Sequence, residues 1–294
     1  MAKTKLSFAI ALVRRNSVPL VVLALSLLGV LWMWHDDRRA REGLAQEHLS
    51  GLARDLAANL AAEMRMHEQM LRGAAGLLES SSKVSRATFH SYVERLALQP
   101  RFPGILSVGY AEQLTGSAIG AFEHSIRGSD YAEFQIHPPG KRALYVPVIY
   151  VEPSTAQNRG ITGYDMLSEP IRREAIERAR DSGHIALSAR VTLMQDRHAF
   201  APEPGLLLYL PIYHREAPTN DVPQRRAAIK GFVYVALHSE NLFVGALVDE
   251  LKDMRVQVFD GTRADPSKLL FATPQAASAD GIKARKTINA AGRT

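Results

Sequence analysis

The chain begins with a long apolar stretch that carries no charge. Residues 17–34, SVPLVVLALSLLGVLWMW, contain no Asp, Glu, Lys or Arg. At about 1.5 Å of rise per residue, a helix of this length nearly crosses the ~30 Å hydrocarbon core of a bilayer. Trp32 and Trp34 stand where an aromatic belt forms at the membrane surface. The pattern predicts a transmembrane helix at 17–35, preceded by a cytoplasmic N-terminus at 1–16.

The basic residues near this stretch predict its orientation. Lys3, Lys5, Arg14 and Arg15 precede it, and basic residues beside a span favour the cytoplasmic side. A cleavable signal peptide has similar features, but the stretch ends in LWMWH rather than in a small-residue cleavage site. We therefore expect a single-pass anchor in the cell inner membrane, with the following residues in the periplasm or outside the cell.

The next segment, 36–82, has the apolar period of an amphipathic helix, with steps of three and four and one gap of seven. One interpretation is a stalk helix that pairs in a homodimer, although Asn59, Glu63 and Gly73 interrupt a possible heptad seam. The alternative is a helix packed on its own domain. We favour the dimeric stalk. The recurring apolar residues are Leu49, Leu52, Leu56, Leu60, Met64, Leu71 and Leu78.

After residue 103 the apolar period changes to two, which is typical of strands. Hairpins joined by a few helices indicate an α+β fold with antiparallel sheets rather than a doubly wound nucleotide-binding fold. Strands are predicted at 105–114, 131–138, 143–153, 185–195, 205–215 and 229–239, helices at 89–98, 117–128, 170–180 and 240–253, and a hairpin at 254–274.

Composition narrows the range of functions. The absence of cysteine excludes disulfides, zinc–thiolate sites and cysteine nucleophiles. A net charge of +6, partly at the two termini, does not indicate a nucleic-acid partner. Glycine-rich phosphate loops, H-E-x-x-H and G-x-S-x-G are all missing from the sequence. We expect no catalytic residue, metal site or cofactor in these residues.

One polar loop combines several features of a binding site. Gly160 and Gly163 lie in it, Asp165 stands at its exit, and an Arg-rich helix follows. Asp165 can fix a ligand amine, or it can cap the backbone by accepting N–H bonds. We favour the cap, which would order the loop.

Arg172 and Arg173 stand in the first turns of that helix, where positive charge opposes the helix dipole. They can meet an anionic ligand, or they can pair with Glu169 or Glu177. The ion pair is the simpler explanation, and an anionic ligand is the alternative.

Aromatic and polar side chains on or beside the central strands are candidates to line a ligand cavity. Ordinary packing in the sheet core is the alternative for each of them. The candidate ligand-binding residues are Tyr145, Asp165, Met166, Arg172, Ser188, Thr192, Met194 and Tyr209.

Several segments in order, among them RFPGILSVGYAEQL, GYDMLSEPIRREAIERARDSG, GLLLYLPIY and KGFVYVALHSENLF, resemble the CHASE domain, an extracellular sensory module of bacterial and plant receptors. The resemblance spans about 86–248. It implies a stalk helix followed by tandem PAS-like subdomains, of which the distal one holds the ligand. Family members continue through a second span to a cytoplasmic histidine kinase, diguanylate cyclase or phosphodiesterase. We expect 249–294 to be a membrane-proximal hairpin and the tail of a truncated receptor.

Two departures from the family pattern bear on the ligand. Plant cytokinin receptors of this family read adenine with an aspartate, and the matching position is Arg172. Ser188, Met194 and Tyr209 stand where those receptors carry Thr, Leu and Thr. The resemblance therefore implies an anionic or smaller ligand rather than a cytokinin.

The sequence predicts the small-molecule-sensing region of a membrane-anchored receptor. One alternative is the N-terminal part of a diguanylate cyclase or sensor histidine kinase, with the catalytic domain outside these residues. The other is an anchored scaffold protein in which core side chains fill the pocket.

Overall fold

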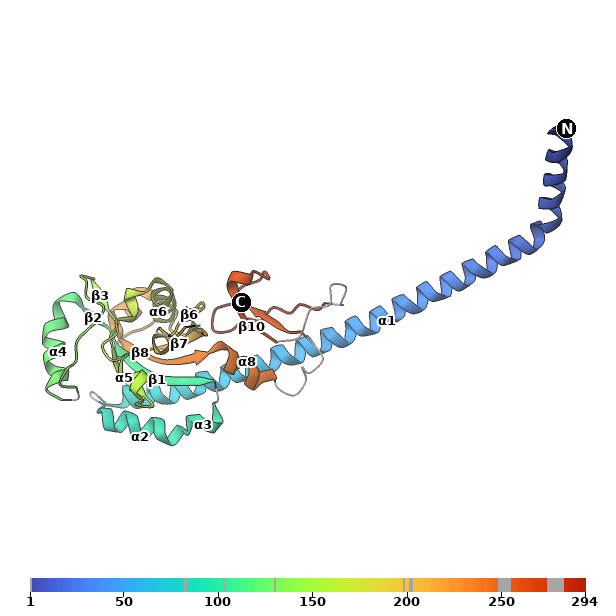
Figure 1. Ribbon diagram of the computed structural model, residues 1–294. Helices are drawn as coiled ribbons and strands as arrows, with labels where there is room; N and C mark the ends of the chain where they lie inside the picture. Colours follow the sequence, from blue (N-terminus) through green and yellow to red (C-terminus); the bar gives the residue numbers. More distant parts are fainter. Residues whose placement is uncertain are drawn as a thin grey trace. The chain divides into compact units, whose positions relative to one another are not determined.

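The computed structural model describes residues 2–81, 84–102, 104–129, 131–197, 199–200, 203–247, 255–273 and 283–294, with side chains left out at 2–18, 20, 99–100 and 245–247 (Figure 1). The chain divides into two compact units. The first comprises Met1–Arg54 and Ser278–Lys286, and the second comprises Asp55–Ala277 and Thr287–Thr294.

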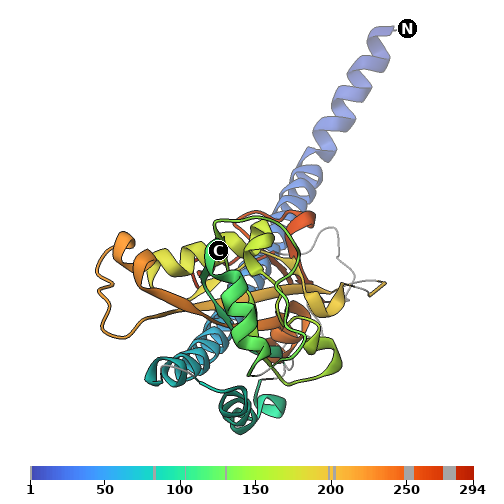
Figure 2. The ribbon, with the colours of Figure 1, turned by 90° about the vertical axis from the view of Figure 1, so that its left-hand side faces the viewer.

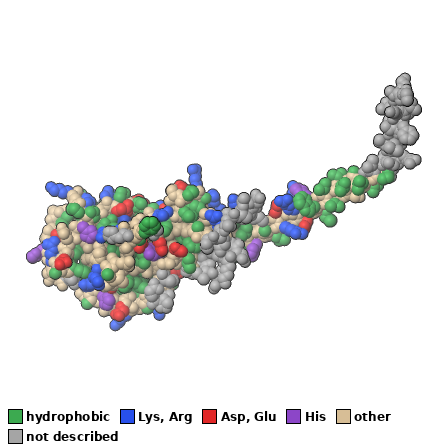
Figure 3. Space-filling model, viewed as in Figure 1, with side chains coloured by type: hydrophobic (Ala, Val, Ile, Leu, Met, Phe, Trp, Pro, Cys, Tyr) green, Lys and Arg blue, Asp and Glu red, His purple; other side chains and the backbone are tan. Residues whose placement is uncertain are grey.

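Helix α1 (Ala2–Ser80) runs without interruption through the predicted stalk segment, which confirms a continuous helix there. In the first unit its large apolar side chains between Val21 and Trp34 are 54% to 71% exposed (Figure 3). Within the described residues, no helix has a stretch long and apolar enough to cross a membrane. The side chains of Ser17, Val18 and Leu20, at the start of the predicted span, lie outside the described residues.

The second unit is built on a six-stranded sheet in the described part of the chain. Its order is β4 (Val148–Glu152), β1 (Ile105–Glu112), β8 (Ile229–His238), β7 (Pro204–Tyr213) and β5 (Ala186–Leu187), and β6 (Val191–Thr192) also pairs with β7. All these pairings are antiparallel. The sheet confirms the predicted α+β class.

The two faces of the sheet bury alternate residues of the central strands β7 and β8. On β8, Val233 and Val235 face one core, whereas Phe232 and Tyr234 face the other. The first core contains α1 residues and the second contains α6 residues, so we call them the α1-side core and the α6-side core. Figures 1 and 2 show α1 and α2 on one side of the sheet and α6 on the other.

Part of the apolar pattern of α1 is explained by packing on the helix's own domain, without a second copy of the chain. Leu60, Met64, Leu71 and Leu78 are all buried in the α1-side core. Packing on its own domain therefore explains this half of the pattern, because steps of three and four place these residues on one helix face. The apolar residues Leu49, Leu52 and Leu56 are only half-buried, and dimer formation through the stalk stays a prediction.

Smaller elements surround the sheet. The β9–β10 pair confirms the predicted hairpin at 254–274. The described residues include one large sheet, so tandem PAS-like subdomains stay a prediction. The remaining elements are α2 (Arg86–Leu96), α3 (Leu98–Arg101), β2 (Leu114–Thr115), η1 (Gly116–Ala118), α4 (Ile119–Arg127), β3 (Leu144–Tyr145), α5 (Ala156–Arg159), η2 (Met166–Ser168), α6 (Pro170–Ser182), η3 (Met194–Asp196), α7 (Val222–Ala228), α8 (Ser239–Leu247), β9 (Gln257–Phe259), η4 (Pro266–Lys268) and β10 (Leu269–Ala272).

The strand predicted at 131–138 is wrong. Its backbone groups up to residue 136 bond locally or to a side chain, and His137 forms an isolated parallel bridge with Tyr164 rather than a strand. Phe134 N donates to Tyr131 O at 3.2 Å, and Ile136 N donates to Glu123 Oε1 at 2.8 Å. The alternating apolar residues do enter a core, but turns and a carboxylate satisfy the backbone.

Two other predictions need adjustment. The strand expected at 185–195 is split into β5 and β6, and between them the Ser188 hydroxyl donates to Ala189 O at 2.8 Å. The helix expected at 240–253 is present as α8 up to Leu247, and 248–254 lie outside the described residues.

Candidate ligand site beneath helix α6

A small cavity lies within the α6-side core. Its volume is about 20 Å³, which is enough for roughly one water molecule. Typical organic-ligand pockets hold about 300–1,000 Å³, so a ligand would have to displace side chains. The lining residues are Ile161, Tyr164, Met166, Arg172, Leu193, Met194, Gln195, Leu207, Tyr234 and Ala236.

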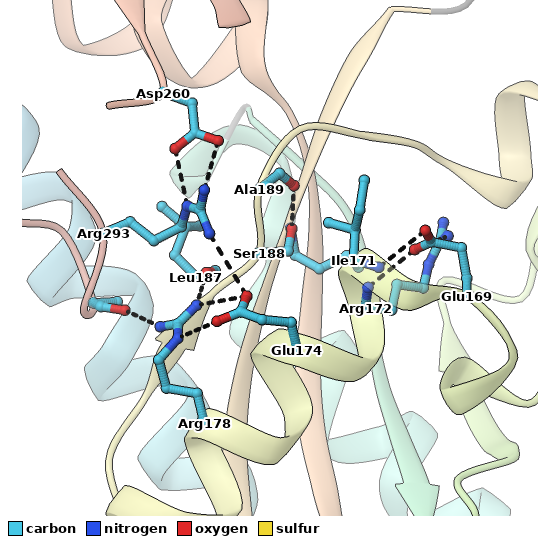
Figure 4. Close-up of polar contacts among 12 residues, drawn as sticks. Glu169, Ile171, Arg172, Glu174, Arg178, Leu187, Ser188, Ala189, Asp260 and Arg293 are labelled. Carbon is cyan, nitrogen blue, oxygen red and sulfur yellow. Dashed lines mark hydrogen bonds and ion pairs between the residues drawn. The ribbon is translucent and has the colours of Figure 1, made fainter. Parts of the chain in front are cut away.

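Arg172 forms the charged part of the cavity wall, and only 4% of it is exposed. Helix α6 begins with Pro170, and the Glu169 carboxylate caps it by accepting from the backbone N–H groups of Ile171 and Arg172, both at 3.0 Å (Figure 4). Arg172 Nη1 lies 3.3 Å from Glu169 Oε2, which confirms the predicted ion pair.

The rest of the Arg172 guanidinium faces the cavity region. Its Nη2 donates to the Thr192 carbonyl at 2.8 Å, which ties α6 to β6. Its Cζ lies 5.5 Å from the centre of the Tyr164 ring, within cation–π range. The same side chain therefore holds the wall together and brings a positive charge to the cavity.

Tyr234 lines the cavity and lies opposite a second tyrosine on the neighbouring strand. Tyr209 on β7 and Tyr234 on β8 are register partners, with ring centres 6.3 Å apart. Within the described residues, neither hydroxyl has a hydrogen-bond partner, and both side chains are almost fully buried. Burial raises the pKa of both hydroxyls, and the nearby Arg172 guanidinium offsets part of the rise. Both stay neutral and can donate a hydrogen bond.

Gly109 makes room for the Tyr234 ring. It is the register partner of Tyr234 on β1, and a Cβ at this glycine would lie 2.4 Å from atoms of the ring. The ring therefore lies across the glycine, where any larger residue would displace it. Sequence analysis missed Tyr234, although the alternation of β8 already places it on the same face as Phe232.

Asp165 organises the loop and is absent from the cavity lining. Its side chain is fully buried. Oδ1 accepts from Val146 N at 2.8 Å and from Leu167 N at 3.1 Å, and Oδ2 pairs with Arg142 Nε at 2.7 Å. The predicted capping role of Asp165 is confirmed, because both oxygens are engaged in holding the loop.

The other predicted site residues are distributed unevenly. Met166 and Met194 line the cavity with Arg172, whereas Tyr209 is not among the lining residues and packs beside Tyr234, which is. The backbone carbonyl of Thr192 accepts the hydrogen bond from Arg172, while the Thr192 side chain is exposed. The structure therefore places three of the eight in the cavity wall and two in contact with residues of the wall. A ligand-binding role for any of them stays a prediction.

Ser188 and Tyr145 have structural partners away from the cavity. The Ser188 hydroxyl accepts from Leu207 N at 3.0 Å and thereby joins the sheet edge to β7. Tyr145 belongs to the α1-side core, and its hydroxyl accepts from Arg142 N at 2.8 Å. Neither residue is part of the cavity lining.

Gln195 is a second polar residue that sequence analysis missed. Its Nε2 donates to Ser107 Oγ at 3.2 Å and to Asn158 Oδ1 at 3.1 Å. Asn158 Nδ2 in turn donates to Pro153 O at 2.8 Å. The amide nitrogen of Gln195 is thus held by Ser107 and Asn158, which fixes the Gln195 side chain in the cavity wall.

Known proteins provide the context for this site. The family model of the CHASE domain matches residues 82–271. Histidine kinase 3 of Arabidopsis thaliana is 26% identical over 221 residues, which cover 69% of this chain and 20% of the relative. Probable histidine kinase 4 of Oryza sativa subsp. japonica is 28% identical over 179 residues, which cover 60% of this chain and 16% of the relative. The chain thus spans at most about a fifth of the length of these two relatives.

Two solved sensory domains are among the structures that match this chain. The ligand-binding domain of the amino acid chemoreceptor PctC of Pseudomonas aeruginosa PAO1, in complex with GABA, has a TM-score of 0.47 at 14% identity, covering 78% of this chain and 76% of that one. The ligand-binding domain of the chemoreceptor CtaA of Pseudomonas fluorescens, in complex with L-isoleucine, has a TM-score of 0.45 at 13% identity, covering 80% and 74%.

The family assignment rests on the family model, whose match at 82–271 extends beyond both ends of the resemblance at 86–248. The matched residues make up more than half of the chain. The chain therefore belongs to the CHASE domain family, whose members are extracellular ligand-sensing regions of membrane receptors.

Proposed function

We propose that this chain senses a small molecule in the cavity beneath α6 and passes the binding event to α1. One observation carries the proposal: a buried arginine and a buried tyrosine hydroxyl without a partner in the described residues line the same cavity. An unpaired buried polar group costs about 1–3 kcal/mol, and natural cores contain few of them. A ligand that pairs with these groups offsets that cost.

The same observation speaks against the scaffold alternative. A core that serves packing alone is more stable with phenylalanine than with tyrosine at a position where the hydroxyl has no partner. Tyr209 and Tyr234 both carry such hydroxyls, and they are neighbours in the same core. The small volume of the cavity is consistent with a closed state that opens when a ligand enters.

The sheet supplies a route from the cavity to α1. On β8, Tyr234 lines the cavity, while its neighbours Val233 and Val235 lie in the α1-side core. That core also contains Leu71 and Leu78 of α1. A ligand shifts α1 only to the extent that it binds one packing arrangement more tightly than another.

The exposed apolar side chains between Val21 and Trp34 support a membrane anchor at 17–35, because exposed apolar surface of this extent marks a membrane or protein contact. The sensor would then lie outside the inner membrane, and the stalk would pair in a homodimer. Both curated relatives are named histidine kinases, which favours a kinase over a cyclase as the output of the whole receptor.

The test is a thermal-unfolding screen of the full chain in mild detergent against organic acids, amines, purines and peptides. A ligand at 100 times its Kd should stabilise the protein by about 2.7 kcal/mol. Ala236→Val narrows the cavity and should abolish the shift, whereas Ala228→Val changes an equally buried alanine outside the lining and should preserve it. If no compound of any class shifts unfolding, the scaffold alternative is favoured.

A further inference from the structure

We propose that the cavity beneath α6 selects a small carboxylate that carries no ammonium group, bound by the Arg172 guanidinium and the Tyr234 hydroxyl. This inference rests on the proposed function, because it names the ligand class of the same cavity. Tyr209 is the register partner of Tyr234 on the neighbouring strand, and its ring packs beside that of Tyr234.

The charged and hydroxyl groups of the cavity are donors. A guanidinium donates hydrogen bonds and accepts none, and a neutral tyrosine hydroxyl donates readily to an anion. Among the lining residues that the structure describes, there is no Asp or Glu to meet a ligand cation. An ammonium group would therefore enter without a counter-charge and beside the positive charge of Arg172, which is unfavourable in a buried site.

Arg172 retains donors for a ligand. Of its five N–H groups, the described contacts use one toward Glu169 Oε2 and one toward the Thr192 carbonyl. The Glu169 contact is long at 3.3 Å, because the same carboxylate also accepts from the backbone N–H groups of Ile171 and Arg172 at 3.0 Å. A carboxylate can bind from the cavity side without breaking the helix cap.

The apolar part of the lining sets the size of the ligand. Met166, Met194 and Leu193 line one part of the cavity, and Met194 is only half-buried. Methionine side chains change rotamer easily and fill or vacate irregular space. Ile161, Leu207 and Ala236 line the remainder. A carboxylate with a short aliphatic tail fits if the tail displaces Met194.

The test compares matched probes by isothermal titration calorimetry on the full chain in mild detergent. Butyrate should bind, whereas butyramide lacks the charge and 4-aminobutyrate adds an ammonium group, and both should bind at least tenfold more weakly. Tyr234→Phe should weaken butyrate binding roughly ten- to hundred-fold, the usual effect of losing one hydrogen bond to a charged group. Arg172→Gln should weaken it at least as much.

Thermal unfolding separates a ligand-binding hydroxyl from a structural one. Tyr234→Phe removes a hydroxyl with no protein partner in the described residues, so the melting temperature of the unliganded protein should stay equal or rise. Tyr213→Phe is the control, because the Tyr213 hydroxyl donates to Arg180 O at 2.7 Å outside the cavity. It should lower the melting temperature and leave butyrate binding unchanged.

Three results would overturn the inference: butyramide binding as tightly as butyrate, wild-type affinity in Tyr234→Phe, or a loss of stability in Tyr234→Phe equal to that in Tyr213→Phe. If a neutral or cationic compound binds instead and loses binding in Ala236→Val, the proposed function stands and only the carboxylate assignment fails. If no compound binds, both fail.

Discussion

Arg293, the penultimate residue of the chain, forms a bidentate pair with Asp260. Its Nε lies 2.9 Å from Oδ1, and its Nη2 lies 2.8 Å from Oδ2 (Figure 4). Nη1 also lies 3.6 Å from a carboxylate oxygen of Glu174 on α6. These contacts join the last residues to the β9–β10 hairpin and to the helix that carries Arg172.

The neighbouring backbone strengthens this attachment. The carbonyl of Ala291 accepts from Leu187 N and from Arg178 Nη1, both at 3.1 Å. Gly292 adopts a φ of +79°, and a Cβ there would lie 2.9 Å from Arg178 Nη1. We call Ala290–Arg293 the C-terminal clasp. Helix α6 contacts the clasp through Glu174 and Arg178 and carries Arg172 in the cavity wall. A shift of α6 would therefore change the contacts at the clasp and at the cavity together.

Arg293→Ala should destabilise the protein by about 1 kcal/mol, because the bidentate pair is partly shielded from solvent. For a domain of this size, the melting temperature should fall by about 2–4 °C. Adding Asp260→Ala should cost little more, since both substitutions break the same pair. Arg285→Ala, at an exposed position, is the control and should leave melting unchanged. Additive losses in the double variant would contradict a direct pair.

Asp165→Asn should destabilise the protein by about 3 kcal/mol, because it removes the charge partner of Arg142 and places an amide against backbone donors. Urea unfolding followed by circular dichroism gives the difference. Asp265→Asn is the matched control at an exposed cap, where asparagine caps as well as aspartate. Equal stability of Asp165→Asn and the wild type would show that the loop is ordered by other contacts.

Gly109→Ala should destabilise the protein by about 1–3 kcal/mol, because the new methyl group displaces the Tyr234 ring. The same variant should weaken the binding of any ligand that accepts a hydrogen bond from the Tyr234 hydroxyl. Gly76→Ala is the opposite case, since it lies in α1, where a new methyl group would have no atom of the described residues within 4 Å. It should stabilise the helix by about 0.5–1 kcal/mol. The same sign of change in both variants would contradict the close approach at Gly109.

The stability of the protein should fall between pH 6.5 and pH 4 because of His67. Its side chain is buried in α1 beside Phe102, with Glu63 Oε1 at 3.7 Å from Nε2. Burial lowers the pKa of His67 to about 4. The unfolded chain therefore binds a proton that the folded protein excludes, and stability present above pH 6.5 is lost as pH falls.

His67→Leu tests this pH dependence. At pH 4, protonation of His67 in the unfolded chain should lower the free energy of unfolding of the wild type by about 3 kcal/mol. Free energies of unfolding in urea at pH 7.5, 5.5 and 4.5 should fall more steeply for the wild type than for the variant. Parallel slopes would assign the acid sensitivity to carboxylates such as Glu174, whose pKa is lowered by its hydrogen bond to Arg178.

If α1 pairs in a homodimer, Leu52→Lys combined with Leu56→Lys should shift the protein toward monomer. Both side chains are half-buried, and charged residues at such a seam repel each other. Sedimentation velocity in mild detergent measures the change, with exposed Leu44→Lys as the control. Dimers of unchanged stability would contradict pairing through this part of α1.

Local patterns in the sequence predicted most of the elements. The apolar steps of three and four predicted a continuous helix through 36–80, and Pro170 marked the start of α6 correctly. The apolar period of two predicted β7 and β8. The strand at 131–138 failed because a pattern of period two reports which side chains are buried, but not whether the backbone finds a neighbouring strand.

The site depended on contacts between distant parts of the chain. The type of residue identified Arg172, Met166 and Met194 as candidates, and a polar loop identified Asp165 as a cap. Only the register of β7 against β8 places Tyr209 opposite Tyr234, and only the register of β1 against β8 places Gly109 beneath that ring.

The sequence by itself therefore determined the helices, the central strands and the family resemblance, because period, proline and capping residues act over a few neighbouring positions. The tertiary structure decided which side chains share a cavity, why Asp165 pairs with Arg142, and that Arg293 returns to Asp260. Such pairings depend on strand register and on how the two cores close, and a shift of one residue in register would exchange their faces.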